Sequence, residues 1–182
     1  DKLMEGDYHV GQILDALKEL GVDDNTLLVF ASDNGPQGET AREMGNQGTP
    51  DMGNSGPFRG EVGEATEASI RTFCFIRWPG GGLRHGEDIV PLNAHIDVFP
   101  TLVELCGLKL HRDPQFDGRS FRTQLLETSP AVPERVLFVE RQRTFKPEKW
   151  DGAVAMTSRW RLVKGKELYD IKDDPAQTRN VI

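Results

Sequence analysis

Two segments dominated by apolar residues constrain the fold of this chain more than any other feature. The first is TLLVFA at residues 26–31, and the second is IRTFCFIRW at residues 70–78. Such runs, without regular polar alternation, are typical of strands buried on both faces, as in parallel sheets covered by helices. Apolar residues spaced by three and four predict amphipathic helices over 3–20 and 93–106. This combination of strands and helices predicts an α/β fold.

The last third of the chain has a different pattern. Short strand-like runs at 135–141, 153–157, 160–163 and 168–169 alternate with turn residues and predict a small antiparallel sheet. A short helix is expected at 120–126, and the final DDPAQTRNVI is expected to be a turn followed by a helix or a tail. We therefore predict an α/β part at 1–128 and a small antiparallel subdomain at 129–182. Residues 35–65 form a glycine-rich loop, for which we expect poor order over 37–53.

Length and composition exclude some classes of protein. The 182 residues suffice for one domain with or without an appendage, and the net charge of −7 argues against a general nucleic-acid binder. No apolar run approaches the roughly 18 residues that span a bilayer. Cys74 and Cys106 lie in apolar patterns and are expected to be buried. These cysteines therefore do not indicate whether the protein works in an oxidising or a reducing compartment. The sequence begins without Met and directly enters a helical pattern, and we interpret it as a piece of a longer protein.

The first candidate site follows the first strand. Asp33 and Asn34 stand at its carboxyl end, where open α/β sheets place their ligand crevice, and their side-chain oxygens suit Ca²⁺ or Mg²⁺. Gly35 permits a sharp turn beside them. Asn-Gly is also a common turn signal, so a plain turn is an equal interpretation of the residues alone.

The second candidate site is the segment GPFRGEVGEATEASIRTF at 56–73. Arg59 and Arg71 could clamp an anion, but a solvated loop with local Arg–Glu pairs explains the same residues. The four histidines lie at positions 9, 85, 95 and 111, and no two of them have the spacing of a metal-ligand pair.

The order of these segments resembles the C-terminal part of a type I sulfatase, a family of the alkaline-phosphatase-like superfamily. The resemblance is carried by YHVGQILDALKELGVDDNTLLVFASDNGP, FRGEVGEATEASIRTFCFIRWPGG, AHIDVFPTLVELCGL, FDGRSF and WRLVKGKELYDIKDDPAQT. It implies part of an alkaline-phosphatase-like sheet flanked by helices, followed by the small antiparallel sheet. It also implies that Asp33 and Asn34 are ligands of the family's single divalent cation, usually Ca²⁺.

The family's nucleophile is not found in this sequence. Members oxidise a cysteine or serine to formylglycine within a cysteine-x-proline-x-arginine motif, which lies N-terminal to the Asp-Asn pair, and neither cysteine here has that context. The resemblance implies sulfate ester hydrolysis by the complete enzyme, in which Asp33 would polarise the hydroxyl of the nucleophile. The implied substrate is a sulfated small molecule or glycan, and this chain alone is expected to be inactive. Family members are often exported, which favours a periplasmic or extracellular location.

One departure from the family pattern concerns sulfate binding. Val62 occupies the position where the family usually has a lysine that contacts the sulfate, so Arg59 or another group would have to replace that cation. Glu67 and Arg71 keep the spacing of a family glutamate and arginine, and we interpret them as a supporting ion pair behind the site.

Two rival functions follow from these residues. One is a phosphatase or phosphonate hydrolase of the same superfamily, and the other is a non-catalytic fragment or pseudoenzyme. We also expect the fragment to form a homo-oligomer, because its strands would otherwise present unpaired edges and apolar faces.

Overall fold

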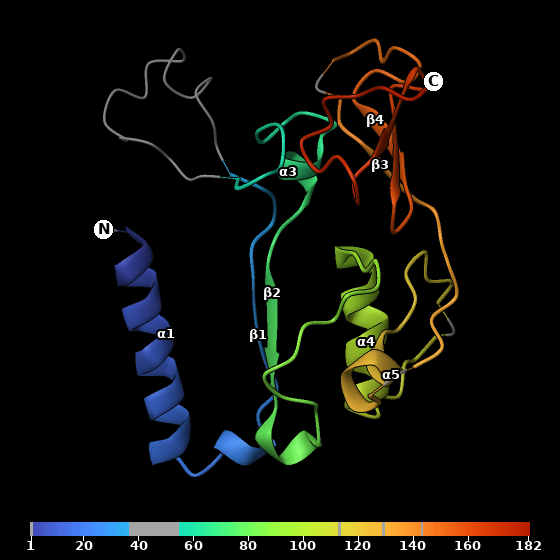
Figure 1. Ribbon diagram of the computed structural model, residues 1–182. Helices are drawn as coiled ribbons and strands as arrows, with labels where there is room; N and C mark the ends of the chain where they lie inside the picture. Colours follow the sequence, from blue (N-terminus) through green and yellow to red (C-terminus); the bar gives the residue numbers. More distant parts are fainter. Residues whose placement is uncertain (1, 37–54, 113, 129, 143) are drawn as a thin grey trace. The chain divides into compact units, whose positions relative to one another are not determined.

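The structure is a computed structural model that describes residues 2–36, 55–112, 114–128, 130–142 and 144–182 (Figure 1). The chain forms two compact units, one of Asp1–Phe30 with Phe75–Val132 and the other of Ala31–Cys74 with Pro133–Ile182. The third crossing between the units, after Val132, falls near the predicted boundary at residue 128. The predicted division did not group residues 31–74 with the C-terminal residues. The division at residue 128 stays a prediction. The loop predicted over 37–53 lies outside the described residues.

The first unit contains most of the predicted helices. Its elements are α1 at Lys2–Glu19, a 3₁₀ turn at Asp23–Asn25, most of β1 at Leu28–Ala31, most of β2 at Cys74–Arg77, 3₁₀ turns at Pro79–Gly81 and His95–Asp97, α4 at Val98–Leu105 and α5 at Arg122–Leu126. Gly21 follows α1 with a φ of 68°, the left-handed conformation that glycine adopts at little cost after a helix. The three predicted helices are thus confirmed, with α4 and α5 shorter than expected.

Strands β1 and β2 form a two-stranded sheet, seen side by side in Figure 1. Beyond their ends the amide of Ser32 donates to the carbonyl of Phe73, and the amide of Gly35 to that of Ser69. The donor position rises from residue 32 to 35 while the acceptor position falls from residue 73 to 69, so these two segments run antiparallel. The expectation of parallel strands was wrong, because an apolar run reports burial and not strand direction. Burial is also incomplete, since Phe30 is 42% exposed and Phe75 is 63% exposed.

Two buried polar side chains, Asp97 and Thr101, join the 3₁₀ turn at His95–Asp97 and helix α4 to the loop that follows α4. The carboxylate of Asp97 accepts hydrogen bonds from the amides of Ala94 at 2.7 Å and Arg119 at 2.8 Å. The hydroxyl of Thr101 donates to the carbonyl of Asp97 and accepts from the amide of Phe121 at 3.0 Å. These bonds satisfy otherwise orphaned groups and explain why α4 and the segment FDGRSF fold together.

The second unit is built on the predicted antiparallel sheet. Its strands are β3 at Leu137–Glu140, β4 at Ala153–Met156, β5 at Trp160–Val163 and β6 at Glu167–Asp170, in that order across the sheet. Each neighbouring pair is antiparallel, with Leu137 opposite Met156 and Arg161 opposite Tyr169. Side chains on one face form the core of this unit, including Leu137, Val154, Met156, Val163 and Tyr169. The prediction of this sheet is confirmed.

Two further expectations, on the cysteines and on Ile70, were wrong. Cys74 and Cys106 are both exposed. Ile70 ends a short helix, α3 at Glu67–Ile70, and does not begin the strand that was predicted over 70–78. The C-terminal residues form a turn followed by chain without a helix, which is the tail of the two expected alternatives, and Gln177 within them is only 1% exposed.

Candidate metal centre

The predicted oxygen ligands lie in a turn directly after β1. Asp33 is exposed and Asn34 is half-buried. The hydroxyl of Ser32 donates to the carboxylate of Asp33 at 3.4 Å and to the backbone carbonyl of Asn34 at 3.2 Å. Within the described part of the chain, the Asp33 carboxylate accepts only that one long hydrogen bond, so most of its lone pairs remain available to a cation.

The turn is held from behind by helix α3. The amide of Gly35 donates to the carbonyl of Ser69 at 2.9 Å, and the amide of Val62 donates to the carbonyl of Pro36 at 2.9 Å. A Cβ atom on residue 35 would overlap the carbonyl of Ala68 and lie 3.1 Å from that of Ser69. The glycine is therefore required because the two backbones approach closely, which fixes the turn against α3.

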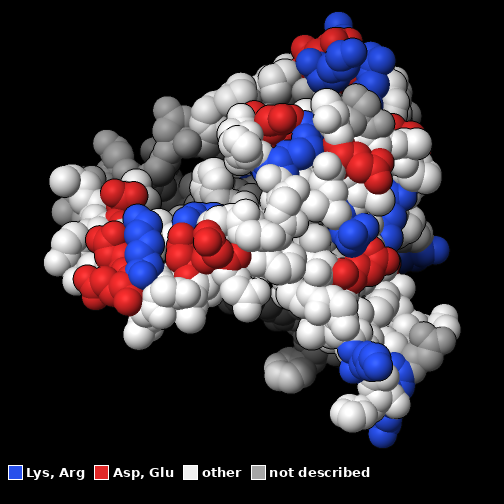
Figure 2. Space-filling model, turned by 90° about the horizontal axis from the view of Figure 1, so that it is seen from below, with Lys and Arg blue, Asp and Glu red and all other residues white. Residues whose placement is uncertain are grey.

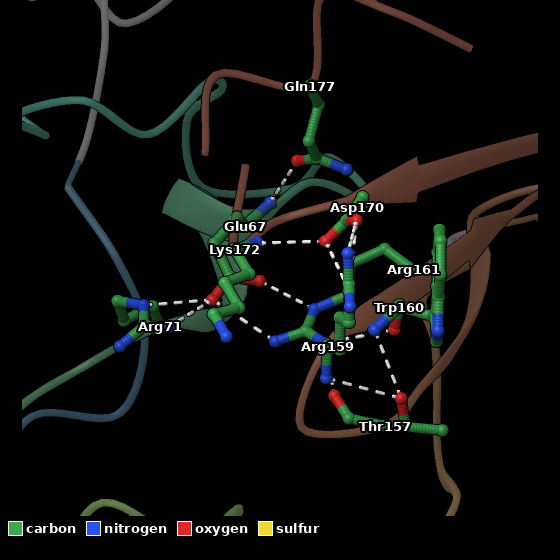
Figure 3. Close-up of polar contacts among 9 residues, drawn as sticks. All are labelled: Glu67, Arg71, Thr157, Arg159, Trp160, Arg161, Asp170, Lys172 and Gln177. Carbon is green, nitrogen blue, oxygen red and sulfur yellow. Dashed lines mark hydrogen bonds and ion pairs between the residues drawn. The ribbon is translucent and has the colours of Figure 1, made fainter. Parts of the chain in front are cut away.

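Helix α3 is in turn anchored by a buried carboxylate (Figure 3). The side chain of Glu67 is 3% exposed and pairs with Arg161, which is also 3% exposed, through Nε at 2.6 Å and a terminal nitrogen at 3.2 Å. Arg71 adds a second cation, with its terminal nitrogen 2.7 Å from the same carboxylate. A buried carboxylate with two guanidinium partners meets the requirement that an interior charge be paired and hydrogen-bonded.

The C-terminal segment completes this cluster through Gln177. Its side-chain oxygen accepts a hydrogen bond from the amide of Glu67 at 2.8 Å. Its backbone carbonyl accepts from Arg59 at 3.1 Å. The hydroxyl of Tyr169 donates to Glu167 at 2.6 Å, and Arg59 interacts with the same hydroxyl through a hydrogen bond and its charge. The bond to Glu167 and partial burial raise the pKa of Tyr169, and Arg59 partly offsets that rise.

The structure brings most of the predicted site residues into one unit. Asp33 and Asn34 are adjacent in the turn, and the ion pair between Glu67 and Arg71 is present. Arg59 donates to the backbone carbonyl of Gln177 at 3.1 Å. No group of three or more His, Cys, Asp or Glu residues suited to a metal occurs in the described ranges.

Two residues of the cluster were missed by the sequence analysis. Arg161 stands two positions before Val163, so strand alternation places both on the inner face of the sheet. A cation at an inward strand position signals a buried acidic partner, and that signal was available. Gln177 gave none, because a polar residue in a C-terminal tail is ordinarily solvated.

The surface charges are mixed. Figure 2 shows Lys and Arg beside Asp and Glu in clusters separated by uncharged surface on the face that it draws. Two ion pairs shift the pKa of their carboxylates. A two-nitrogen contact with Arg77 lowers the pKa of Asp23, and Arg159 lowers that of Asp170. None of the described helices is both long and apolar enough to cross a membrane.

Comparison with solved structures defines the class of fold. A phosphonate monoester hydrolase of Agrobacterium radiobacter superposes with a TM-score of 0.63 at 25% identity, over 96% of this chain and 34% of that one. A protein solved with its substrate D-glucosamine-2-N,6-O-disulfate gives a TM-score of 0.63 at 21% identity, over 98% of this chain and 34% of the other. The predicted alkaline-phosphatase-like α/β fold with a small C-terminal antiparallel sheet is confirmed.

Sequence comparison identifies the family. The sulfatase family model matches residues 1–108, and the chain belongs to that family. It is 33% identical over 156 residues to the steryl-sulfatase of Mus musculus, covering 86% of this chain and 24% of the relative. It is 29% identical over 208 residues to human arylsulfatase A, covering 100% of this chain and 38% of the relative. The chain therefore spans about a quarter to two fifths of the length of these curated relatives.

Proposed function

We propose that this chain is the C-terminal part of a sulfatase that hydrolyses sulfate esters, and that Asp33 and Asn34 help to hold its divalent cation. The observation that supports this most directly is the Asp33-Asn34 turn, which is fixed on α3 by the hydrogen bond from Gly35 to Ser69. Membership of the sulfatase family supports the reaction class. The catalytic nucleophile, expected to be a formylglycine, is proposed to lie outside this chain.

The two residues fit the proposed cation chemically. Ca²⁺ prefers several oxygen ligands at 2.3–2.6 Å, and a carboxylate with a neighbouring amide carbonyl supplies two of the required type. Asp33 carries no ion pair within the described residues, so its charge is not already neutralised. Bound there, the cation would stabilise negative charge that develops on the sulfate oxygens. Two ligands rarely hold calcium well, so this chain by itself should bind the ion weakly.

The proposed roles of the other residues follow from their contacts. Asp33 would also orient the hydroxyl of the nucleophile, because its carboxylate is exposed beyond the strand end. Glu67 with Arg71 would support the turn from behind without touching substrate. Arg59 remains the candidate sulfate contact, although its guanidinium is bound to the carbonyl of Gln177.

The substrate proposed is a sulfated small molecule or glycan. Relatives named as a steryl-sulfatase and as an N-acetylgalactosamine-6-O-sulfatase support this breadth, as does the disulfated glucosamine bound to one structural neighbour. These relatives differ in the alcohol that carries the sulfate, so the substrate is proposed as a class and not as one compound.

Phosphonate monoester hydrolysis is a second candidate function, favoured by the two structural neighbours with that name. Aryl sulfate and aryl phosphonate monoesters compared as substrates of the complete protein would decide between them. We expect kcat/KM to be higher for the sulfate, and a higher value for the phosphonate would reverse the assignment. Failure to hydrolyse either ester would support the pseudoenzyme alternative that Val62 suggests.

The metal proposal is tested with the variant Asp33→Ala in the complete protein. The Ca²⁺ concentration that restores half of the activity after chelation should rise about tenfold or more, because an anionic ligand is lost. Asp23→Ala is the control, since Asp23 pairs with Arg77 and not with the turn. An unchanged calcium requirement for Asp33→Ala would contradict the assignment of this residue.

A further inference from the structure

The Glu67 carboxylate is enclosed to an extent that a surface ion pair does not require. Both Glu67 and Arg161 are 3% exposed, while the third member, Arg71, is 50% exposed. Removing two charges from water is costly, and it is compensated only when the geometry is good and the remaining donors and acceptors are used.

Arg161 is itself held rigidly by the C-terminal sheet. One terminal nitrogen donates to the carbonyls of Thr157 and, at 3.0 Å, of Trp160. Its Nε and the other terminal nitrogen face the two oxygens of Glu67, at 2.6 and 3.2 Å (Figure 3). Because the planar guanidinium is fixed at both ends, it determines where the Glu67 side chain lies.

The position of Glu67 is transmitted to the turn through two adjacent backbone contacts. Ser69, two residues later in α3, accepts the hydrogen bond from Gly35, and the carbonyl of Ala68 lies against the Cα of the same glycine. Gly35 follows directly after Asn34. Arg161 is thus linked to the oxygen pair through Glu67, α3 and Gly35, all within one compact unit.

We propose that Arg161 is a positioning residue for the oxygen ligands Asp33 and Asn34, by which the C-terminal sheet fixes the geometry of the cation site. The proposal rests on the proposed function, in which that pair holds a divalent cation. Arg161 touches neither ligand, so its effect is on where the turn lies and not on the chemistry.

The sheet offers a matched control two residues away. Arg159 pairs with Asp170 at 2.5 Å and with Asp173 at 3.1 Å, both within the C-terminal part of the chain. Arg159→Gln therefore removes an arginine and its ion pairs from the bend directly before β5, and none of those pairs is with α3. A general loss of sheet stability would affect both variants, whereas positioning of the turn would be lost only in Arg161→Gln.

The experiment compares wild type, Arg161→Gln, Arg161→Lys and Arg159→Gln in the complete protein. Amide hydrogen exchange is measured without metal at Gly35, relative to the amide of Cys106, which donates to Leu102 in the other unit. Ca²⁺ affinity is measured by calorimetry. We expect at least tenfold faster relative exchange at Gly35 and about tenfold weaker Ca²⁺ binding in Arg161→Gln, with an intermediate effect for Lys and neither change in Arg159→Gln.

Each outcome decides the proposal. Faster exchange at Gly35 with unchanged Ca²⁺ affinity would reduce Arg161 to a structural anchor and overturn the positioning role, as would equal effects in Arg159→Gln. If Arg161→Gln does not fold, Arg161→Lys decides, because it retains the charge but loses the planar guanidinium that joins Glu67 to the carbonyls of Thr157 and Trp160. If wild type does not bind Ca²⁺, the proposed function fails instead, and exchange at Gly35 still tests whether Arg161 fixes the turn.

Discussion

Replacing Gly35 by alanine tests the packing that fixes the candidate metal centre. An added Cβ would overlap the carbonyl of Ala68 and lie 3.1 Å from the carbonyl of Ser69, and both are backbone atoms that cannot rotate away. Overpacking of this kind costs about 1–3 kcal/mol. The strained turn would also weaken the hydrogen bond from Gly35 to Ser69, which contributes about 0.5–1.5 kcal/mol. We expect Gly35→Ala to destabilise the protein by roughly 2–4 kcal/mol.

The assay is urea-induced unfolding of the complete protein, followed by circular dichroism, with the midpoint compared at constant slope. Gly11→Ala is the matched control, because Gly11 lies in α1 and a Cβ there would meet nothing within 4 Å. Alanine favours a helix over glycine by about 1 kcal/mol, so the control should be neutral or slightly stabilised. If both variants unfold at the wild-type midpoint, the close contact between the turn and α3 is wrong, and with it the path from Arg161.

Three further predictions follow from the sequence and the structure. Val62→Lys, which restores the cation usual in the family, should raise kcat/KM of the complete protein for an aryl sulfate about tenfold or more, and an unchanged value would show that the cation is not limiting. Arg159 lowers the pKa of Asp170 below its usual 3.8, so this carboxylate stabilises the fold above about pH 4, and the contribution is lost as pH falls through the lowered pKa. Asp170→Asn should therefore flatten the acid branch of the stability profile, measured by unfolding at several pH values. An unchanged acid branch would contradict this. The 182-residue chain should be a dimer or larger oligomer by light scattering, because Phe30 and Phe75 are exposed beside one another with their rings stacked, and a monodisperse monomer would contradict that.

The sequence predicted element types well where a local pattern controls them. Helix α1 follows from the spacing of its apolar residues and from Gly21, and the C-terminal sheet follows from alternation between turns. Local patterns failed where distant residues decide. Ile70 belongs to α3 because Glu67, three residues earlier, is bound by Gln177 and Arg161 from the C-terminal part of the chain. Nothing near position 70 in the sequence records those partners.

The candidate site divides in the same way. The oxygen ligands Asp33 and Asn34 could be named from residue chemistry, strand position and resemblance to a family. The residues that hold their turn could be named only in part, since Glu67 and Arg71 are four apart on one helical turn whereas Arg161 lies 94 residues beyond Glu67. The direction of the strands before the site was also missed, because an apolar run does not encode which way its neighbour runs.

By itself the sequence determined the family, the helices α1, α4 and α5, the antiparallel sheet and the chemistry available in the turn after β1. Periodicity, glycine placement and side-chain oxygen atoms are local properties, and they can be read without coordinates. Only the tertiary structure decided that a buried arginine of the C-terminal sheet supports that turn, through Glu67 and α3. The reason is physical: a charge can be buried only where distant parts of the chain bring its partners to it, and that meeting is a property of the folded chain.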